Sequence, residues 1–213
     1  ISSILLSQIS SNDDVSDSFK TSKAVAITNP NKHIAINDSR RITIKLPKVL
    51  SDEEILARFV KGFFGGWWFG PERAALKSFG KILVGFEGLK EAPVSKRIWS
   101  NAKLSNSHVP PLYSVLFGAF RVVDLMVAHP KDEEDSYIGF AFGSDNWPLA
   151  GAHRFCISRR DEVGGENVVT IKFVHSGCDP RENKPLSPAF LQTLHLWYAM
   201  VLFREGIAEV MKA

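Results

Sequence analysis

The 213-residue sequence has few cysteines, and the two it has, Cys156 and Cys178, match no common metal-binding spacing. Small secreted domains that depend on disulfide bonds usually contain more cysteines than this. We therefore expect both thiols to be small core or strand residues rather than a redox pair.

Excess charge and long hydrophobic runs are absent as well. The chain has 26 basic and 23 acidic residues, for a net charge of +3, and the basic residues are scattered in groups of two at most. This balance argues against binding to nucleic acid. No stretch approaches the ~20 apolar residues of a membrane span, and the apolar start at residues 1–6 is too short for a signal peptide. We expect a cytoplasmic protein without a membrane span, as a monomer or homodimer.

The familiar catalytic motifs are missing too. The sequence has no His-Glu-x-x-His, no Gly-x-Ser-x-Gly, no phosphate loop and no dinucleotide fingerprint. Residues 62–66 are rich in glycine but lack the Lys-Ser/Thr that ends a phosphate loop. We therefore expect neither a metal nor a cofactor.

The N-terminal part changes character near residue 24. Residues 7–23 are rich in Ser, Asp and Asn, so we expect residues 1–23 to be a mobile tail and residues 24–213 to be a single domain. Residues 24–28 and 33–36 read as short strands separated by an Asn-Pro-Asn-Lys turn. Residues 41–46 alternate with period two and stop at Pro47, which predicts a strand.

Two short helices are predicted next. Ser51 and Glu54 form a capping box, which predicts a helix to about residue 61. Pro71 opens a second helix, and Gly80 is the expected C-terminal stop.

Strand periodicity then dominates until a long helix closes the chain. The predicted strands are residues 81–86, 114–128, 137–143, 152–158 and 168–175, the last four as an antiparallel meander, and Arg97 to Trp99 could form another. Residues 187–211 predict one long helix with a broad apolar face that includes Leu194 and Trp197. The predicted fold is α+β: a curved antiparallel sheet gripping a long C-terminal helix, with two short helices nearer the N-terminal side.

This order of elements, over roughly residues 41–211, resembles the helix-grip superfamily of START-type lipid-transfer domains, birch-pollen-type allergens and aromatic polyketide cyclases. Locally, Gly139-Phe140-Ala141-Phe142-Gly143, followed by Pro148 and by residues 153–155, resembles the signature of a family known only as a domain of unknown function. The superfamily resemblance implies a cavity between sheet and helix that receives sterols, lipids, flavonoids or polyketides.

Aromatic residues are the most unusual feature of the chain. Five of them surround two glycines at residues 63–69, and aromatic walls suit an apolar ligand. Alternatively, this stretch closes one end of the sheet without meeting a ligand, or exposes Trp67 and Trp68 to a membrane or a partner. The candidate ligand-binding residues are Phe63, Phe64, Trp67, Trp68, Phe140, Phe142, Trp147 and Tyr198.

Polar groups among apolar neighbours are the candidates for chemistry. Three histidines on or at the ends of predicted strands could face one cavity, whereas His195 is expected on the solvent side of the last helix. Asp124 is expected to share a strand face with Val122; if that face points inward, Asp124 would have a raised pKa or pair with an arginine, and otherwise it is a surface residue. The candidate catalytic residues are His129, His153, His175, Arg73, Asp124 and Tyr113.

Three functions are compatible with these features. The first is a cofactor-free enzyme of natural-product metabolism, of the cyclase, isomerase or pericyclase type, acting on an apolar polyene or polyketide-like substrate. The second is a non-catalytic protein that binds or transfers a lipid-like molecule, and the third is an interaction module with a filled core. In the first two cases the partner is an apolar small molecule.

Overall fold

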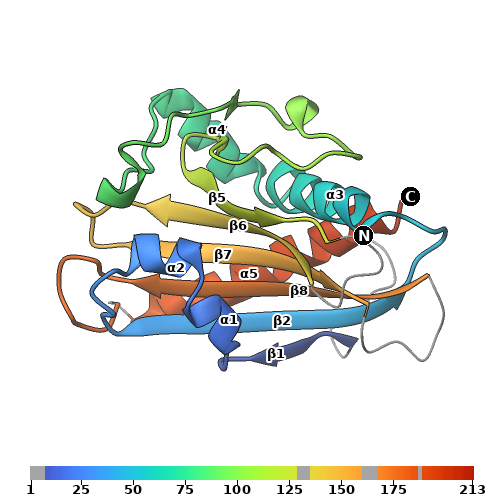
Figure 1. Cartoon of the computed structure of the whole chain (residues 1–213), viewed down its shortest axis with the longest axis horizontal. Coiled ribbons are helices and arrows are strands. Elements are labelled where there is room, and N and C mark those ends of the chain that lie inside the picture. Colours follow the sequence, from blue (N-terminus) through green and yellow to red (C-terminus); the bar gives the residue numbers. More distant parts are fainter. Residues whose placement is uncertain (1–7, 129–134, 160–166, 187–188) are drawn as a thin grey trace.

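The computed structural model describes residues 8–128, 135–159, 167–186 and 189–213, with the side chains of 189–192 excepted. These residues form an α+β fold around one eight-stranded open sheet in the order β1-β2-β8-β7-β6-β5-β4-β3 (Figure 1). Helices cover both faces of this sheet. The predicted fold class is confirmed.

The centre of the sheet is antiparallel, as predicted. The strands predicted at residues 41–46, 137–143, 152–158 and 168–175 are confirmed, and each is longer than predicted. The first begins at residue 35, so it includes part of the strand predicted at 33–36, and it ends at residue 45. The observed strands are β2 (Ala35–Lys45), β6 (Ser136–Gly143), β7 (Ala150–Ser158) and β8 (Val168–Cys178). The register places His153 of β7 directly opposite His175 of β8, so both side chains leave the sheet on the same face.

The other end of the sheet is less regular than the sequence predicted. The strand expected over residues 114–128 is two strands, β4 (Val115–Leu116) and β5 (Phe120–Met126), because Phe117 and Gly118 turn the chain with φ values of 51° and 75°. The Arg97–Ile98 strand, β3, pairs with β4 in parallel. The sheet is therefore mixed rather than wholly antiparallel.

Residues 81–86 do not form the predicted strand. Within the described residues, the only β-type pairing of this segment is an isolated parallel bridge between Gly85 and Ser144. Val84 and Phe86 are buried, which explains the period-two pattern without a strand. The short 3-10 helix η2 (Glu87–Leu89) follows, and a second one, η3 (Asn101–Lys103), comes after β3.

Both helices predicted after residue 50 are confirmed. Helix α3 (Asp52–Gly65) begins at the Ser51 capping box, in which Ser51 Oγ accepts from the Glu54 amide and the Glu54 carboxylate accepts from the Ser51 amide. Helix α4 (Gly70–Phe79) ends at Gly80, whose φ of 62° is the left-handed conformation of a C-terminal cap.

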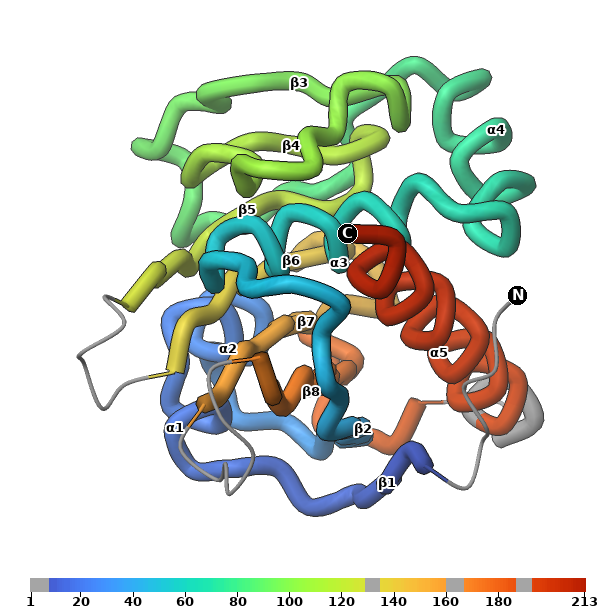
Figure 2. Tube along the Cα trace, turned by 90° about the vertical axis from the view of Figure 1, so that its right-hand side faces the viewer, coloured from blue at the N-terminus to red at the C-terminus, as the bar shows by residue number. Residues whose placement is uncertain are grey.

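Helix α5 (Ala189–Val210) packs against α3 and the sheet (Figure 2), which confirms the long C-terminal helix; Ser187, the predicted start, lies outside the described residues. The predicted buried face is wrong at Leu194 and Trp197, which are 54% and 51% exposed. Apolar residues surround most of the helix, so periodicity alone could not select a face. The buried hydrophobic residues are Ala199, Leu202, Phe203, Ile207 and Val210.

Close contact between α3 and α5 depends on Gly62. A Cβ atom at this position would lie 2.5 Å from the Glu205 carbonyl oxygen and 2.8 Å from the Gly206 Cα. The two helices can approach this closely because both carry glycine at the crossing point.

The N-terminal residues 8–23 are not a tail. They form β1 (Ser10–Asn12), which pairs with β2, and α1 (Asp17–Lys20), whose Phe19 is fully buried. Residues 24–28 are helical rather than extended, within α2 (Lys23–Thr28), with Ser22 as N-cap. Three apolar residues in a polar stretch, Ile9, Val15 and Phe19, are enough to anchor this segment.

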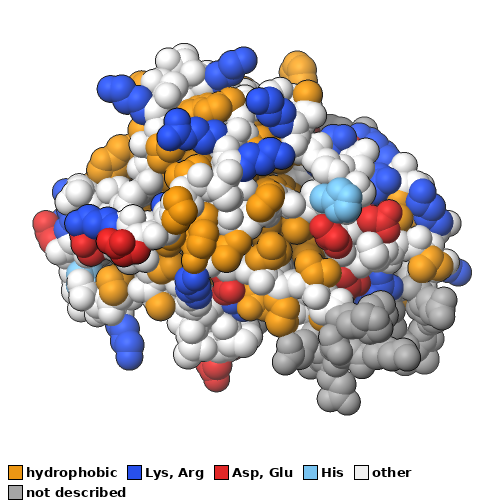
Figure 3. All heavy atoms as spheres, turned by 45° about the horizontal axis from the view of Figure 1, so that its top comes forward, with side chains coloured by type: hydrophobic (Ala, Val, Ile, Leu, Met, Phe, Trp, Pro, Cys, Tyr) orange, Lys and Arg blue, Asp and Glu red, His pale blue; other side chains and the backbone are white. Residues whose placement is uncertain are grey.

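Two apolar cores result, one on each face of the sheet. The larger lies between the sheet and α3 and α5, and the smaller lies under α1, α2 and the segment around η2. Figure 2 shows these two pairs of helices on opposite sides of the sheet. Figure 3 shows a band of hydrophobic side chains across the upper face of the molecule, with Lys and Arg gathered above it. Within the described ranges, none of the helices has the length and apolarity that crossing a bilayer requires.

Candidate functional site

A cavity of about 510 Å³ lies between the sheet and α5, at the end of the sheet where β6 stops and β7 starts. It is bounded by Phe63 of α3 and by Phe69 and Glu72 at the start of α4 on one side, and by Leu186 on another. Its lining is largely apolar and aromatic, as in small-molecule sites. The lining residues are Ile36, Phe63, Phe69, Glu72, Phe120, Phe142, Pro148, Leu149, His153, Phe173, His175, Leu186, His195, Leu196, Tyr198, Ala199 and Leu202.

The central polar feature of this wall is a pair of histidines, here called the histidine dyad: His153 and His175. Both are buried, and their Nδ1 atoms are 3.1 Å apart, so one ring donates a hydrogen bond to the other. The cross-strand pairing of β7 with β8 places them there, since directly opposite residues have adjacent side chains.

Aromatic rings hold the dyad in position. The Phe142 ring stacks on both imidazoles, with centroid distances of 4.7 Å to His153 and 5.7 Å to His175. Phe120 stacks on His153 from 5.9 Å, and Phe173 lies 5.3 Å from it. These contacts restrict the rings to one orientation in an apolar surrounding.

Two glycines make room for this arrangement. A Cβ on Gly151 would lie 2.5 Å from Cζ of Phe142, so the Phe142 ring lies over bare backbone. A Cβ on Gly177 would be 3.1 Å from Nε2 of His175. Both strands therefore carry glycine where the stacked rings approach the sheet most closely.

A third histidine, His195, joins the dyad from α5. Its ring centroid is 4.5 Å from that of His175, and its Nε2 is buried without a hydrogen-bond partner among the described residues. Next to it, Arg40 forms a buried ion pair with Asp38 and donates to the Leu196 carbonyl oxygen at 2.7 Å. Arg40 thus ties β2 to the first turns of α5.

Burial keeps all three imidazoles neutral. It lowers the pKa of His153 and of His175 well below 6.5, and the other histidines of the cluster add to the effect. The pKa of His195 is lowered by burial and then by the positive charge of Arg40. At neutral pH the cavity wall therefore presents uncharged imidazoles, which both donate and accept hydrogen bonds.

A second polar group enters the cavity from another wall. Glu72, in the first turn of α4, accepts a hydrogen bond from the Tyr198 hydroxyl at 3.0 Å. Burial raises the pKa of the Glu72 carboxyl, and the Tyr198 hydrogen bond partly opposes this. Burial also raises the pKa of Tyr198, with the Glu72 charge as a further cause, so the phenol keeps its proton.

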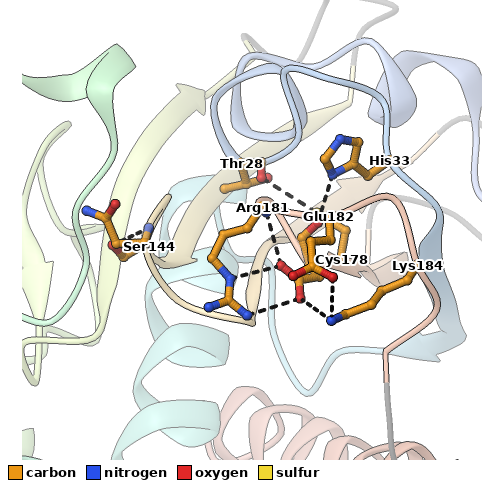
Figure 4. A network of polar contacts seen from close by, with 9 residues as sticks. Thr28, His33, Ser144, Cys178, Arg181, Glu182 and Lys184 are labelled. Atoms are coloured by element: carbon orange, nitrogen blue, oxygen red, sulfur yellow. Dashed lines mark hydrogen bonds and ion pairs between the residues drawn. The ribbon is translucent and has the colours of Figure 1, made fainter.

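The loop that carries Leu186 to the cavity is fixed by Asp179. Its carboxylate accepts from the backbone and side chain of Arg181 and lies 3.9 Å from Lys184 Nζ, and its carbonyl oxygen is 2.9 Å from His33 Nδ1 (Figure 4). The hydrogen bonds from Arg181 lower the pKa of Asp179. This network holds the residues that follow β8 next to the residues that precede β2.

Five of the residues predicted from the sequence line the cavity. Two are predicted catalytic residues, His153 and His175, and three are predicted ligand-binding residues, Phe63, Phe142 and Tyr198. They come from α3, α5 and three strands, so the fold brings together positions that are distant in sequence.

The other predicted ligand-binding residues lie elsewhere. Phe64 and Phe140 are fully buried in the larger core behind the cavity wall. Trp67 is 84% exposed, and the partly exposed Trp68 packs edge-on against Trp197 with a centroid distance of 5.4 Å. Trp147 is also exposed, next to the lining residue Pro148.

Arg73 has a clear structural role. Its guanidinium donates to the carbonyl oxygens of Phe64 and Gly66, which fixes the aromatic loop between α3 and α4. The Glu205 carboxylate fixes the same loop from α5 by accepting from the amides of Trp67 and Trp68.

Asp124 and Tyr113 lie on the other face of the sheet. The prediction that Asp124 shares a strand face with Val122 is wrong. A β-bulge between these two residues turns the Asp124 side chain to the opposite face of the sheet. Asp124 forms an ion pair with Arg154 at 2.8 Å, which agrees with the predicted alternative that Asp124 pairs with an arginine. Tyr113 accepts from Lys23 on that face. The predicted residue His129 lies outside the described residues.

Sequence reasoning missed two of the polar lining residues, His195 and Glu72. His195 lines the cavity, so its expected place on the solvent side of the last helix is wrong. It begins the buried stripe that continues at Ala199 and Leu202, but no periodicity marks that stripe because apolar residues surround most of α5. Glu72 has the sequence context of an ordinary acidic residue in a first helical turn, where the helix dipole stabilises a negative charge. No local pattern distinguishes it from such a residue.

No group of three or more His, Cys, Asp or Glu in the described ranges is arranged to hold a metal ion. Comparisons with protein-family models, with curated proteins and with solved structures found no match to this chain.

Proposed function

We propose that this chain binds an apolar small molecule in the cavity and catalyses a proton shift on it without a cofactor, as an isomerase or cyclase. The observation that carries the proposal is the histidine dyad, two neutral imidazoles joined by a 3.1 Å Nδ1–Nδ1 hydrogen bond in the wall of an otherwise apolar cavity. Burying an imidazole costs desolvation free energy that burying a phenylalanine ring does not. If these positions served packing alone, phenylalanine would fill them at a lower cost.

The bond between the two Nδ1 atoms fixes the roles of the two Nε2 atoms. A neutral imidazole carries one proton, so the ring that donates through Nδ1–H has a bare Nε2, and the ring that accepts at Nδ1 carries its proton on Nε2. Whichever ring donates, the dyad offers one proton acceptor and one proton donor. It is therefore an acid and a base at once.

This pair can move a proton along a substrate without forming an ion. The bare Nε2 takes a proton from one substrate atom, the Nδ1 proton crosses to the partner ring, and that ring delivers its Nε2 proton to a second substrate atom. The substrate double bond shifts, and the dyad ends in the reversed tautomer with no net change in charge. Because an imidazolium is disfavoured at this site, a neutral relay suits it better than stepwise acid–base catalysis.

The position of the cavity supports the resemblance to helix-grip proteins. In this chain a curved sheet packs against a long C-terminal helix, and the cavity lies between them. We infer a helix-grip-like ligand-binding domain, with Phe63, Phe142 and Tyr198 contacting the ligand.

A non-catalytic carrier is the second candidate, and the rim of the cavity favours it. Leu149 and Leu196 line the cavity and yet are exposed, and their neighbours Trp147 and Trp197 are exposed as well. Such a rim suits the transfer of an apolar ligand from another surface.

Binding is tested first, with the neutral apolar dye Nile red. Ala199 is a buried lining residue, so Ala199→Phe should fill part of the cavity and weaken dye binding by about tenfold or more. The matched control, Ala75→Phe, changes an exposed residue of α4 and should leave binding unchanged. Circular dichroism checks that both variants fold, and Ala199→Leu gives a smaller step. Equal dye binding by all variants would contradict a ligand site in this cavity.

Chemistry is tested on the molecule that copurifies with the protein when no detergent is used. Incubated in D₂O with the protein, this molecule should acquire carbon-bound deuterium, which mass spectrometry detects. His153→Phe/His175→Phe should slow this exchange by roughly 10²-fold or more, whereas the control His108→Phe, at an exposed histidine, should not. A bound molecule that never exchanges would identify a carrier and refute the relay.

A further inference from the structure

Among the described residues, the carboxylate of Glu72 is a charge in the cavity wall without a cationic partner. Within the described part of the chain its hydrogen-bond partner is the neutral Tyr198 hydroxyl, and none of the lining residues is Lys or Arg. A half-buried carboxylate in such a place is stabilised when a cation joins it.

The nearby arginines are already engaged. Arg73 donates to two backbone carbonyl oxygens and is electrostatically coupled to Glu205 rather than to Glu72. Arg40 pairs with Asp38 behind the histidines. Neither guanidinium therefore neutralises Glu72.

Three aromatic rings line the same cavity as this carboxylate. Phe69 is the N-cap residue of α4, three positions before Glu72, and its ring lies 5.8 Å from that of Phe120. Both rings and that of Tyr198 line the cavity. Aromatic faces attract cations, most strongly where water is excluded. Glu72 also lies in the first turn of α4, where the helix dipole favours a negative charge.

The same lining disfavours an anion. The three lining histidines are held neutral by burial, so no lining residue offers a positive charge to a carboxylate ligand. An anionic head group would lie near Glu72 without compensation, and like charges in an apolar site repel strongly.

We propose that the cavity selects an apolar molecule with a protonated amine, whose ammonium group binds between the Glu72 carboxylate and the rings of Phe69, Phe120 and Tyr198. This inference rests on the proposed ligand-binding function and adds the charge of the ligand. The amine binds at the α4 wall, while the dyad lies on the sheet. The ligand is thus held by its charged end while its apolar body faces the relay.

Three probes that differ only in head group test this selectivity by isothermal titration calorimetry near neutral pH: octylamine, 1-octanol and octanoate. We expect octylamine to bind at least about tenfold more tightly than either of the others. Glu72→Gln keeps the shape and the Tyr198 contact but removes the charge, so it should weaken octylamine binding by about tenfold or more and leave octanol within about twofold. The matched control Glu87→Gln, at an exposed carboxylate paired with Lys90, should change neither.

The outcomes separate this inference from the proposed function. If octanol or octanoate binds as tightly as octylamine, or if Glu72→Gln leaves octylamine binding unchanged, amine selection is wrong while the ligand cavity stands. If none of the three probes binds, both the amine site and the apolar ligand site are wrong.

Discussion

Replacing both dyad histidines with phenylalanine should change how the stability of the protein depends on pH. In the folded chain the pKa values of His153 and His175 lie well below 6.5 because burial disfavours the imidazolium. Below pH 6.5 the unfolded chain therefore binds protons that the folded chain does not, so stability falls as the pH falls. Near pH 5.5 the loss is about 1.4 kcal/mol for each histidine, or about 3 kcal/mol for the pair.

Urea unfolding near pH 7.5 and near pH 5.5 measures this loss. Glu72 and Asp38 have raised pKa values, so they make the folded protein more stable as the pH falls. His195 has a lowered pKa and adds to the loss of stability at low pH. These groups remain in both proteins, so the difference between wild type and His153→Phe/His175→Phe isolates the dyad. Wild type should lose about 3 kcal/mol more than the double variant. Equal pH dependence of the two proteins would refute the burial of two neutral imidazoles.

Three further predictions concern the stability of the fold, each measured by chemical unfolding. Phe203→Ala should cost about 3–5 kcal/mol, because Phe203 is fully buried, whereas Leu194→Ala should cost less than about 1 kcal/mol; equal costs would contradict the observed face of α5. Asp124→Ala should cost on the order of 3 kcal/mol by leaving Arg154 buried and unpaired, and a second change, Arg154→Met, should recover part of it; a further loss instead would contradict the ion pair. Ser51→Ala should cost about 1 kcal/mol through loss of the capping box, and no change would show that the cap is not formed.

Much of the fold followed from local sequence signals. The capping box at Ser51, the Pro71 and Gly80 boundaries of α4, and the alternating strands β6, β7 and β8 were all predicted because each is encoded within a few residues. The capping hydrogen bonds and strand alternation depend on neighbours in sequence, which is why a single sequence suffices for them.

The errors have physical causes that no local pattern contains. Residues 8–23 were assigned to a tail from their polar composition, yet Val15 and Phe19 bury themselves against the far face of the sheet. The bulge that rotates Asp124 shifts the strand by one residue, and such a shift exchanges the two faces. Helix α5 has hydrophobic residues on nearly every side, so its sequence does not specify the buried face. Contacts with α3 determine which side is buried.

The candidate site was predicted in part. His153 and His175 were recognised as polar residues on strands, but their pairing required the register between β7 and β8, which a single sequence does not specify. Glu72 acquires its importance from Tyr198, 126 residues later, and from the absence of a cation nearby among the described residues. Long-range contacts of this kind appear only in the folded chain.

The relay depends on the dyad holding two neutral imidazoles in opposite tautomers, and ¹⁵N NMR of the histidine side chains measures this directly. The ring nitrogen shifts distinguish a protonated from a bare nitrogen at each position. Near pH 7 we predict that one of His153 and His175 carries its proton on Nδ1 and the other on Nε2, with neither ring charged. An imidazolium at either position, or two rings both protonated on Nε2, would contradict the proposed relay.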